Sequence, residues 1–230
     1  MIISDGLSRT GDELYHTLKG VVGEREDSFP VLVNWTGSRL SEEEFPQEVL
    51  NRESRTDKLA QLIRLDMKNV RIPHYSLFAL EGWLPRTRYH QQGRDFTPRR
   101  PLEPDFWVKR VSADDEWRLH FFRTAKGNIR LLRSGLKLPK GQGYHPWVRS
   151  HRLGWKISYI GGAPEALVEE GRKAIAALNL DFGAVDILQD YHGRGVVLEV
   201  NTCPGLEAGT LSRYVEQILL RAEAKGWRSE

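Results

Sequence analysis

Residues 181–201 constrain the fold more strongly than any other segment of this sequence. Two runs rich in aliphatic residues, 184–188 and 196–200, flank a polar stretch at 189–195 that contains two glycines. A turn-forming cluster between two such runs predicts an antiparallel β-hairpin. We therefore expect a sheet that contains this hairpin and holds one of its faces against a hydrophobic core.

The register of the hairpin divides its side chains between two faces. With the turn centred on 192–193, Val185 lies opposite Val200 and Ile187 lies opposite Leu198. These four side chains form an apolar face, which we expect to pack against the core.

The opposite face of the hairpin carries acids. The same register places Asp186 directly across from Glu199, with Asn201 two residues further along. Two carboxylates opposed on paired strands repel each other, so a positive group is needed near them. A hard divalent cation such as Mg²⁺ accepts these oxygen ligands and fills its remaining positions with water or phosphate. The hairpin alone leaves a second interpretation equally open, in which the acids face solvent and pair with nearby arginines.

The remaining sequence predicts a mixture of strands and helices with loose alternation, which favours the α+β class. Strands are expected at 31–35, 75–78, 106–111, 117–123 and 129–132, and helices at 57–69, 164–178 and 211–225. The first helix follows a potential N-cap, Thr56, and its expected buried side chains are Leu59, Leu62, Ile63 and Met67. Residues 84–104 are expected to form a loop, and 136–162 show no clear pattern.

Composition excludes several classes of protein. The 230 residues carry a formal net charge of +3, and no apolar run is long enough to span a bilayer. The single Cys203 and the acidic Asp5 near the N-terminus favour a cytoplasmic protein over a secreted one.

A cluster of arginines could bind the phosphates of a nucleotide or a nucleic acid, or form a solvated basic face; it comprises Arg86, Arg88, Arg94, Arg99, Arg100 and Arg110.

The segment 199–205, with Asp186 thirteen residues before it, resembles the closing signature of the ATP-grasp superfamily. Its Glu-x-Asn-x-x-Pro-Gly form is shared with D-alanine–D-alanine ligases and ribosomal-protein glutamate ligases. The resemblance implies that Asp186, Glu199 and Asn201 bind one or two Mg²⁺ ions that bridge the ATP phosphates, with Mn²⁺ as a substitute. It also implies two α+β subdomains with antiparallel sheets that clamp ATP. The expected division is 1–50, a reduced N-terminal substrate region, 51–106, a central subdomain, and 107–230, a C-terminal subdomain.

Other segments resemble small, phage-type members of this family. Residues 57–59 before 71–73 resemble an Asp-Lys helix that precedes Gly-Ile-Pro, and 84–94 resemble a flexible phosphate loop. Residues 116–121 and 148–155 resemble the family's Glu-Tyr-Arg-Val-His-Val strand and Val-Arg-Asn-His…Gly-Trp segment. The implied nucleotide-binding residues are Lys58, Arg86, Arg88, Gly93, Lys109, Arg110, Val111, Glu116 and Lys137. This chain departs from the family in having one glycine in the phosphate loop, Gly93, and Lys109 where a glutamate is common.

Arg118 and Arg149 are the candidate catalytic residues. Arg118 alternates along its strand with Trp117 and Leu119, so it should project from the opposite face of the sheet. There it could hold an acyl phosphate or an oxyanion; the alternative for either arginine is an ion pair with a structural carboxylate. Cys203 has no adjacent base, which makes it a packed side chain rather than a nucleophile.

The resemblance implies an ATP- and Mg²⁺-dependent ligase that activates a carboxylate as an acyl phosphate for attack by an amine. Its partners would be small-molecule or peptide substrates rather than a membrane or a nucleic acid. The protein would be cytoplasmic, in the cytoplasm of the host if it is phage-encoded. Because small relatives often dimerise, a homodimer is one state that the resemblance allows. Two other classes remain as alternatives: a catalytically silent ATP-binding module and a basic nucleic-acid-binding protein.

Overall fold

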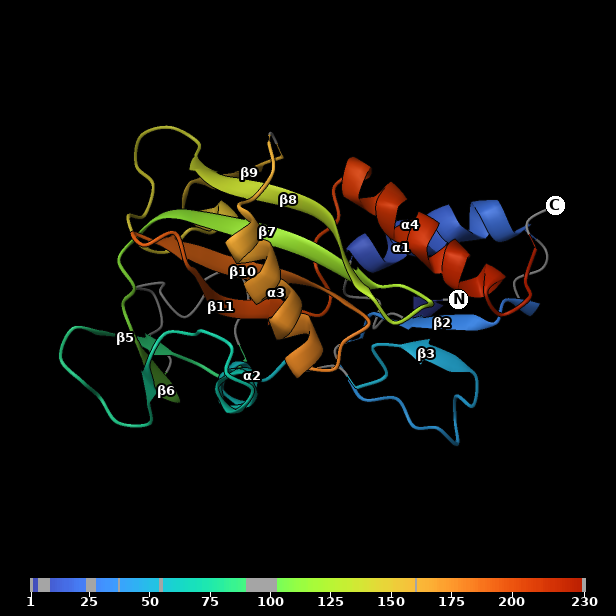
Figure 1. Ribbon diagram of the computed structural model, residues 1–230, viewed down its shortest axis with the longest axis horizontal. Helices are drawn as coiled ribbons and strands as arrows, with labels where there is room; N and C mark the ends of the chain where they lie inside the picture. Colours follow the sequence, from blue (N-terminus) through green and yellow to red (C-terminus); the bar gives the residue numbers. More distant parts are fainter. Residues whose placement is uncertain are drawn as a thin grey trace.

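The computed structural model describes residues 2–3, 9–23, 28–36, 38–53, 56–89, 103–159 and 161–228. Within these ranges the chain forms one large sheet, two small sheets and four α-helices (Figure 1). None of the helices in these ranges is long and apolar enough to cross a membrane.

The large sheet is antiparallel and has the strand order β11-β10-β7-β8-β9. Its strands are β7 (Ala113–Arg123), β8 (Ile129–Pro139), β9 (Trp155–Ser158), β10 (Phe182–Asp190) and β11 (Gly195–Asn201). Helix α3 (Glu165–Ala177) crosses one face of this sheet (Figure 1) and buries Leu167 and Ile175 against Leu119, Phe121 and Val185. On the other face, one part carries Phe122 and Phe182, which pack in a second core, and the part around Arg118 and Asp186 carries polar side chains.

A smaller antiparallel sheet lies beside the large one (Figure 1). Its order is β4-β6-β5, with β4 at Tyr75–Ser76, β5 at Trp83–Arg86 and β6 at Phe106–Lys109. Helix α2 (Lys58–Met67) packs Leu59 and Leu62 against Phe106 and Val108 of this sheet. Two antiparallel sheets, each with its own helix, confirm the α+β class.

The N-terminal segment shares a core with the C-terminal helix. A parallel three-stranded sheet, β1 (Ile2–Ile3), β2 (Val31–Asn34) and β3 (Glu48–Leu50), packs with α1 (Arg9–Val22) and α4 (Ala208–Glu223). The core they form also contains side chains of the large sheet; its members include Leu14, Trp35, Phe122, Phe182 and Tyr214. The expected division at 50, 106 and 230 stays a prediction, and its boundary at 106–107 falls inside β6.

Several predicted element bounds and one predicted helix face were wrong. Helix α2 has Asp57, not Thr56, as its N-cap, because the Asp57 carboxylate accepts a hydrogen bond from Ala60 N at 3.0 Å. Ile63 and Met67 are 39% and 76% exposed. Leu59 and Leu62 are buried as predicted, and the third buried leucine is Leu65, because α2 packs against the small sheet and against the core beneath α3 at the same time.

The stretch predicted as a loop at 84–104 begins as a strand. Residues 84–86 belong to β5, because they pair with β6 and Leu84 packs into the small core. Residues 90–102 lie outside the described part of the chain.

The stretch 136–162, for which the sequence showed no clear pattern, holds the end of β8, a 3₁₀ turn at His151–Leu153 and β9. Helix α4 starts at Ala208, three residues before its predicted start, and α3 starts just after Pro164.

Candidate active site

The predicted hairpin forms, with one difference in register. Val185 pairs with Val200 and Asp186 pairs with Glu199, as the sequence predicts. Ile187 pairs with Val197 rather than Leu198, because the register shifts between Asp186 and Ile187. This β-bulge adds one residue to β11 and turns Leu198 toward the same side as Glu199. Both side chains line a cleft, and Val197 stays buried in the core.

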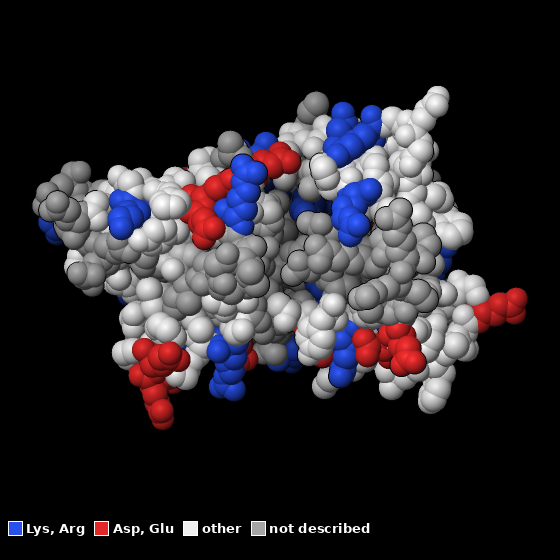
Figure 2. All heavy atoms as spheres, turned by 180° about the vertical axis from the view of Figure 1, so that it is seen from behind, with Lys and Arg blue, Asp and Glu red and all other residues white. Residues whose placement is uncertain are grey.

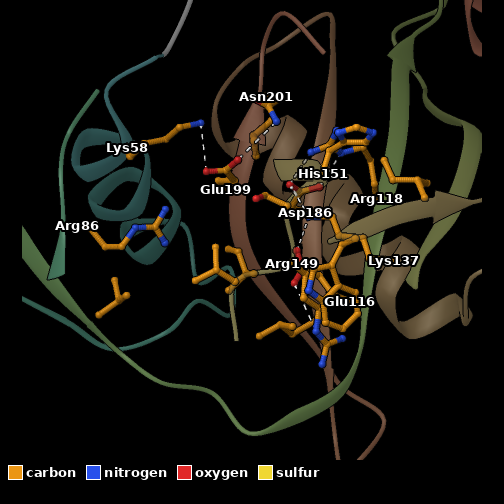
Figure 3. Close-up of a pocket in the computed structure, with 18 of the residues that line it drawn as sticks. Lys58, Arg86, Glu116, Arg118, Lys137, Arg149, His151, Asp186, Glu199 and Asn201 are labelled. Atoms are coloured by element: carbon orange, nitrogen blue, oxygen red, sulfur yellow. Dashed lines mark hydrogen bonds and ion pairs between the residues drawn. The ribbon is translucent and has the colours of Figure 1, made fainter. Parts of the chain in front are cut away.

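Arg118 meets Asp186 across the next pair of strands. The register of β7 and β10 places these two residues opposite each other. The predicted alternation holds, because Trp117 and Leu119 are buried beneath α3 and Arg118 lines the cleft. Arg118 Nε donates to Asp186 Oδ1 at 2.8 Å and Nη2 donates to Oδ2 at 2.8 Å, a bidentate pair (Figure 3).

Lys137 joins two acids in the floor of the cleft. Its ammonium donates to Asp186 Oδ2 at 3.0 Å and also to Glu116 Oε1. All three side chains are buried, and Arg149 approaches Glu116 Oε2 to 4.0 Å (Figure 3). The sequence proposed Lys137 as a nucleotide-binding residue, and its burial excludes a lysine that is merely solvated. The cluster is held together by charges that have little contact with water.

These contacts set the charge of each group. Burial would raise the pKa of Asp186, but the charges of Arg118 and Lys137 outweigh burial and lower it. Burial raises the pKa of Glu116, and Lys137 offsets only part of this effect. Burial would lower the pKa of Lys137, but Asp186 and Glu116 raise it. Asp186 is therefore an anion and Lys137 a cation at neutral pH.

Helix α2 brings a second lysine to the hairpin. Buried Gln61 donates to Val200 O at 2.9 Å and accepts from Val200 N at 3.1 Å, so the helix is hydrogen-bonded to the outer edge of β11. One turn earlier in α2, Lys58 Nζ lies 3.5 Å from Glu199 Oε2. On the other side, Asn201 Nδ2 lies 3.5 Å from Glu199 Oε1 (Figure 3). Sequence reasoning missed Gln61, because a buried glutamine in a helix carries no local signal of its partner.

The cleft has a volume of about 1450 Å³ and is lined by both antiparallel sheets and the N-terminal segment. It brings together twelve of the fourteen residues proposed from the sequence. They are Lys58, Arg86, Lys109, Arg110, Val111, Glu116, Arg118, Lys137, Arg149, Asp186, Glu199 and Asn201. Arg88 does not line it: its Nε pairs with Asp57 Oδ2 at 3.3 Å beside the N-cap of α2. Gly93 lies outside the described residues.

Known proteins share this architecture at low sequence identity. No protein-family model and no curated protein matches the sequence. The ATP-grasp ligase PsnB in complex with a minimal precursor is 11% identical, with a TM-score of 0.63 over 96% of this chain and 97% of that one. D-alanine–D-alanine ligase from Bacillus anthracis is 14% identical, with a TM-score of 0.62 over 98% of each chain. The chain has the ATP-grasp fold.

A third solved structure supports the same assignment. N5-carboxyaminoimidazole ribonucleotide synthetase from Thermotoga maritima is 11% identical, with a TM-score of 0.55 over 90% of this chain and 62% of that one. Residues 109–111 line the cleft, and Lys109 N donates to His74 O at 2.7 Å. The Arg110 guanidinium lies 4.7 Å from the ring centroid of Trp147, an exposed aromatic residue that the sequence did not single out.

The carboxylates of this ATP-grasp cleft can hold a magnesium ion. Among the described residues, no three His, Cys, Asp or Glu side chains gather into a metal site. Asp186, Glu199 and the Asn201 amide supply only oxygen ligands, which suits an ion that takes few protein ligands. Asp186 has about four acceptor positions and accepts three hydrogen bonds from Arg118 and Lys137, so Oδ1 keeps one position for a cation. The donor set fits Mg²⁺.

Proposed function

We propose that this chain is an ATP- and Mg²⁺-dependent ligase that activates a carboxylate as an acyl phosphate for attack by an amine. The fold supports this proposal, since PsnB and D-alanine–D-alanine ligase are ligases and one PsnB structure holds Mg and ADP. The observation that carries it is the row Asp186, Glu199 and Asn201, which lies in one cleft with Lys58, Arg118, Lys137 and Arg149.

The cationic side chains suit phosphoryl transfer. This reaction needs positive charge around the γ-phosphate and alignment of the attacking and leaving oxygens, with little covalent work by the protein. Lys58 and Lys137 line the cleft and would hold phosphate oxygens, and Arg118 would offer a planar fork of donors. Bound Mg²⁺ would add Lewis-acid charge at the phosphates.

The proposed chemistry proceeds in two steps. A carboxylate oxygen attacks the γ-phosphorus, the bond from that phosphorus to the bridging oxygen breaks, and ADP leaves. The amine then attacks the acyl carbon and loses a proton, and inorganic phosphate leaves as the amide forms. Arg149 lies 5.0 Å from the Trp155 ring centroid and donates to Ala113 O at 3.1 Å. We assign Arg118 and Arg149 to the developing negative charge on the acyl group.

We assign the other end of the cleft to the carboxylate or amine substrate. Thr36 and Ser38 line the cleft there, on the loop after β2. Buried Asn34 accepts hydrogen bonds from Thr36 N at 3.0 Å and Oγ1 at 2.8 Å, and donates to Ser38 O at 2.7 Å. One buried amide thus holds both Thr36 and Ser38 by hydrogen bonds, and such support suits a binding wall.

The surface gives less support to a nucleic-acid-binding protein. On the face drawn in Figure 2, the described lysines and arginines are interspersed with aspartates and glutamates and do not gather into one basic stripe. Nucleic-acid binding generally uses such a stripe to neutralise several phosphates. Within the cleft, Lys58, Arg118 and Lys137 are each paired with an acid.

The test is ADP formation by the wild type over panels of carboxylates and amines, with Mg²⁺ and with Mn²⁺. We expect ADP only when ATP, metal, a carboxylate and an amine are all present. Arg118→Ala should reduce the rate by about 10²–10³-fold, as loss of a group that stabilises transition-state charge does. Tight Mg-ATP binding without ADP from any pair would favour the silent module, and undiminished turnover in Arg118→Ala would contradict the assigned role of Arg118.

A further inference from the structure

The carboxylates proposed to bind Mg²⁺ each hold a protein cation. Asp186 holds Arg118 at 2.8 Å and Lys137 at 3.0 Å, and Glu199 lies 3.5 Å from Lys58. These three cations are also the residues proposed to hold the phosphates of ATP. The groups that would bind the two halves of Mg-ATP are therefore paired with one another.

Because of this pairing, Mg²⁺ has to compete with the protein cations for the carboxylates, and ATP has to compete with the carboxylates for the protein cations. Three of about four acceptor positions of Asp186 are taken by Arg118 and Lys137, and both positions of Oδ2 are used. A cation can bind Asp186 at the open position of Oδ1, but its charge then lies beside Arg118 and Lys137 and weakens their hydrogen bonds to the carboxylate. A phosphate that draws Arg118 or Lys137 away leaves a buried carboxylate without its partner, which is costly.

We propose that the site binds ATP and divalent cation by an exchange of partners. Arg118, Lys137 and Lys58 turn from the carboxylates to the phosphates, and the carboxylates turn to the cation. ATP alone or the divalent cation alone disturbs the internal ion pairs and provides a new partner for only one side of each pair. The two ligands together provide phosphates for the protein cations and a metal ion for the carboxylates. The exchange rests on the proposed function, and it makes the binding of metal and of nucleotide strongly cooperative.

The exchange predicts that removal of one carboxylate strengthens the binding of metal-free ATP, which simple loss of a metal ligand would not do. In Asp186→Asn, Arg118 and Lys137 lose their anionic partner and are released to phosphate. Metal-free ATP should therefore bind more tightly to this variant than to the wild type, although Mg-ATP should bind more weakly. A site in which Asp186 serves only the metal would show no gain for metal-free ATP.

The experiment is calorimetric titration of ATP in EDTA, of MgCl₂, and of ATP with MgCl₂, into wild type and variants. In the wild type we expect Mg²⁺ to strengthen ATP binding by about 100-fold, near the upper end of typical couplings between sites. In Asp186→Asn, binding of ATP in EDTA should tighten by about tenfold, the effect of one charge-assisted hydrogen bond. The strengthening by Mg²⁺ should fall to within about fivefold.

Two further variants keep the result decisive. Glu169→Gln also removes one negative charge, but Glu169 lies exposed on α3 and pairs with Arg172. Its affinities for ATP in EDTA and for Mg-ATP should therefore match the wild type. Glu199→Gln releases Lys58 in the same way that Asp186→Asn releases Arg118. If circular dichroism shows that Asp186→Asn is unfolded, Glu199→Gln takes its place.

The outcomes separate the exchange from the proposed function. If wild type binds Mg-ATP cooperatively but neither cleft variant gains affinity for ATP in EDTA, the exchange is wrong and the ligase proposal stands. An equal gain in Glu169→Gln also contradicts the exchange, since net charge would then explain the effect. Absence of ATP binding by folded wild type under every condition overturns the proposed function and the exchange with it.

Discussion

His120 lies two residues beyond Arg118 on the same face of β7 and is completely buried. Its Nδ1 lies 3.3 Å from the Tyr214 hydroxyl, and Nε2 has no hydrogen-bond partner among the described residues. Burial and the charge of Arg118 lower the pKa of His120 to about 3. Between about pH 3 and pH 6.5 the folded protein therefore holds this imidazole neutral, whereas the unfolded chain, with an ordinary pKa near 6.5, takes up a proton.

This burial predicts a loss of stability in mild acid. Between pH 6.5 and about 3 the unfolded state binds a proton at His120 that the folded state does not, so the free energy of unfolding falls as pH falls. From pH 7 to pH 5 His120 should account for about 2 kcal/mol of that fall. Urea unfolding at both pH values should show a smaller decrease, by this amount, in His120→Gln. Equal decreases in wild type and variant would show that His120 is protonated in the folded protein.

At the scale of elements, α3 approaches the large sheet closely at Gly171. A Cβ atom built there would lie 2.7 Å from Phe121 Cε2 and 2.9 Å from Cζ, closer than carbon atoms tolerate. Phe121 is fully buried beneath the helix and has little room to move. The distance between α3 and the sheet at this point therefore depends on the glycine.

Two glycine substitutions in helices should therefore act in opposite directions. Gly171→Ala should lower the free energy of unfolding by about 1–3 kcal/mol, because the added methyl group overpacks the core. Gly20→Ala, in α1, meets nothing within 4 Å and should raise it by about 0.5–1 kcal/mol through higher helix propensity. Urea denaturation measures both. Stabilisation by Gly171→Ala would mean that α3 can move away from β7 without cost.

The bulge at Leu198 shows where the prediction of elements stops. Alternation of side chains predicted both strands of the hairpin and the pairing of Asp186 with Glu199. An extra residue in one strand leaves no mark in an alternating pattern, so the pairing of Ile187 with Val197 was missed. The bulge turns Leu198 into the cleft beside Glu199.

At the scale of the whole molecule, Asn51 joins the N-terminal sheet to the large sheet. Its amide donates to Phe182 O at 2.9 Å and accepts from Asp181 N at 2.8 Å and Phe182 N at 3.2 Å. Its backbone has φ of 55°, in the left-handed region that asparagine and glycine tolerate. One residue after β3 thus fixes the start of β10, the strand that carries Asp186.

Variants at Asn51 should separate the contribution of its side-chain hydrogen bonds from that of its left-handed backbone conformation. Asn51→Gly keeps the backbone conformation but leaves buried groups at 181–182 unpaired, which should lower the free energy of unfolding by about 2–4 kcal/mol. Asn51→Ala should cost about 1 kcal/mol more, because alanine is strained at positive φ. Urea unfolding followed by tryptophan fluorescence compares them with wild type. If Asn51→Gly were as stable as wild type, the shared apolar core alone would hold the N-terminal segment in place.

The sequence by itself determined the hairpin, the opposed acids, the side of the sheet from which Arg118 projects and the α+β class. These features follow from alternation and local turn chemistry, which act between residues close in the chain or paired through one turn. Only the tertiary structure decided that Lys137 is buried between Glu116 and Asp186, that Gln61 binds the backbone of β11, and that Asn51 joins two sheets. Each of these depends on partners far apart in sequence, whose meeting is set by the packing of whole elements and by the cost of leaving buried polar groups unpaired.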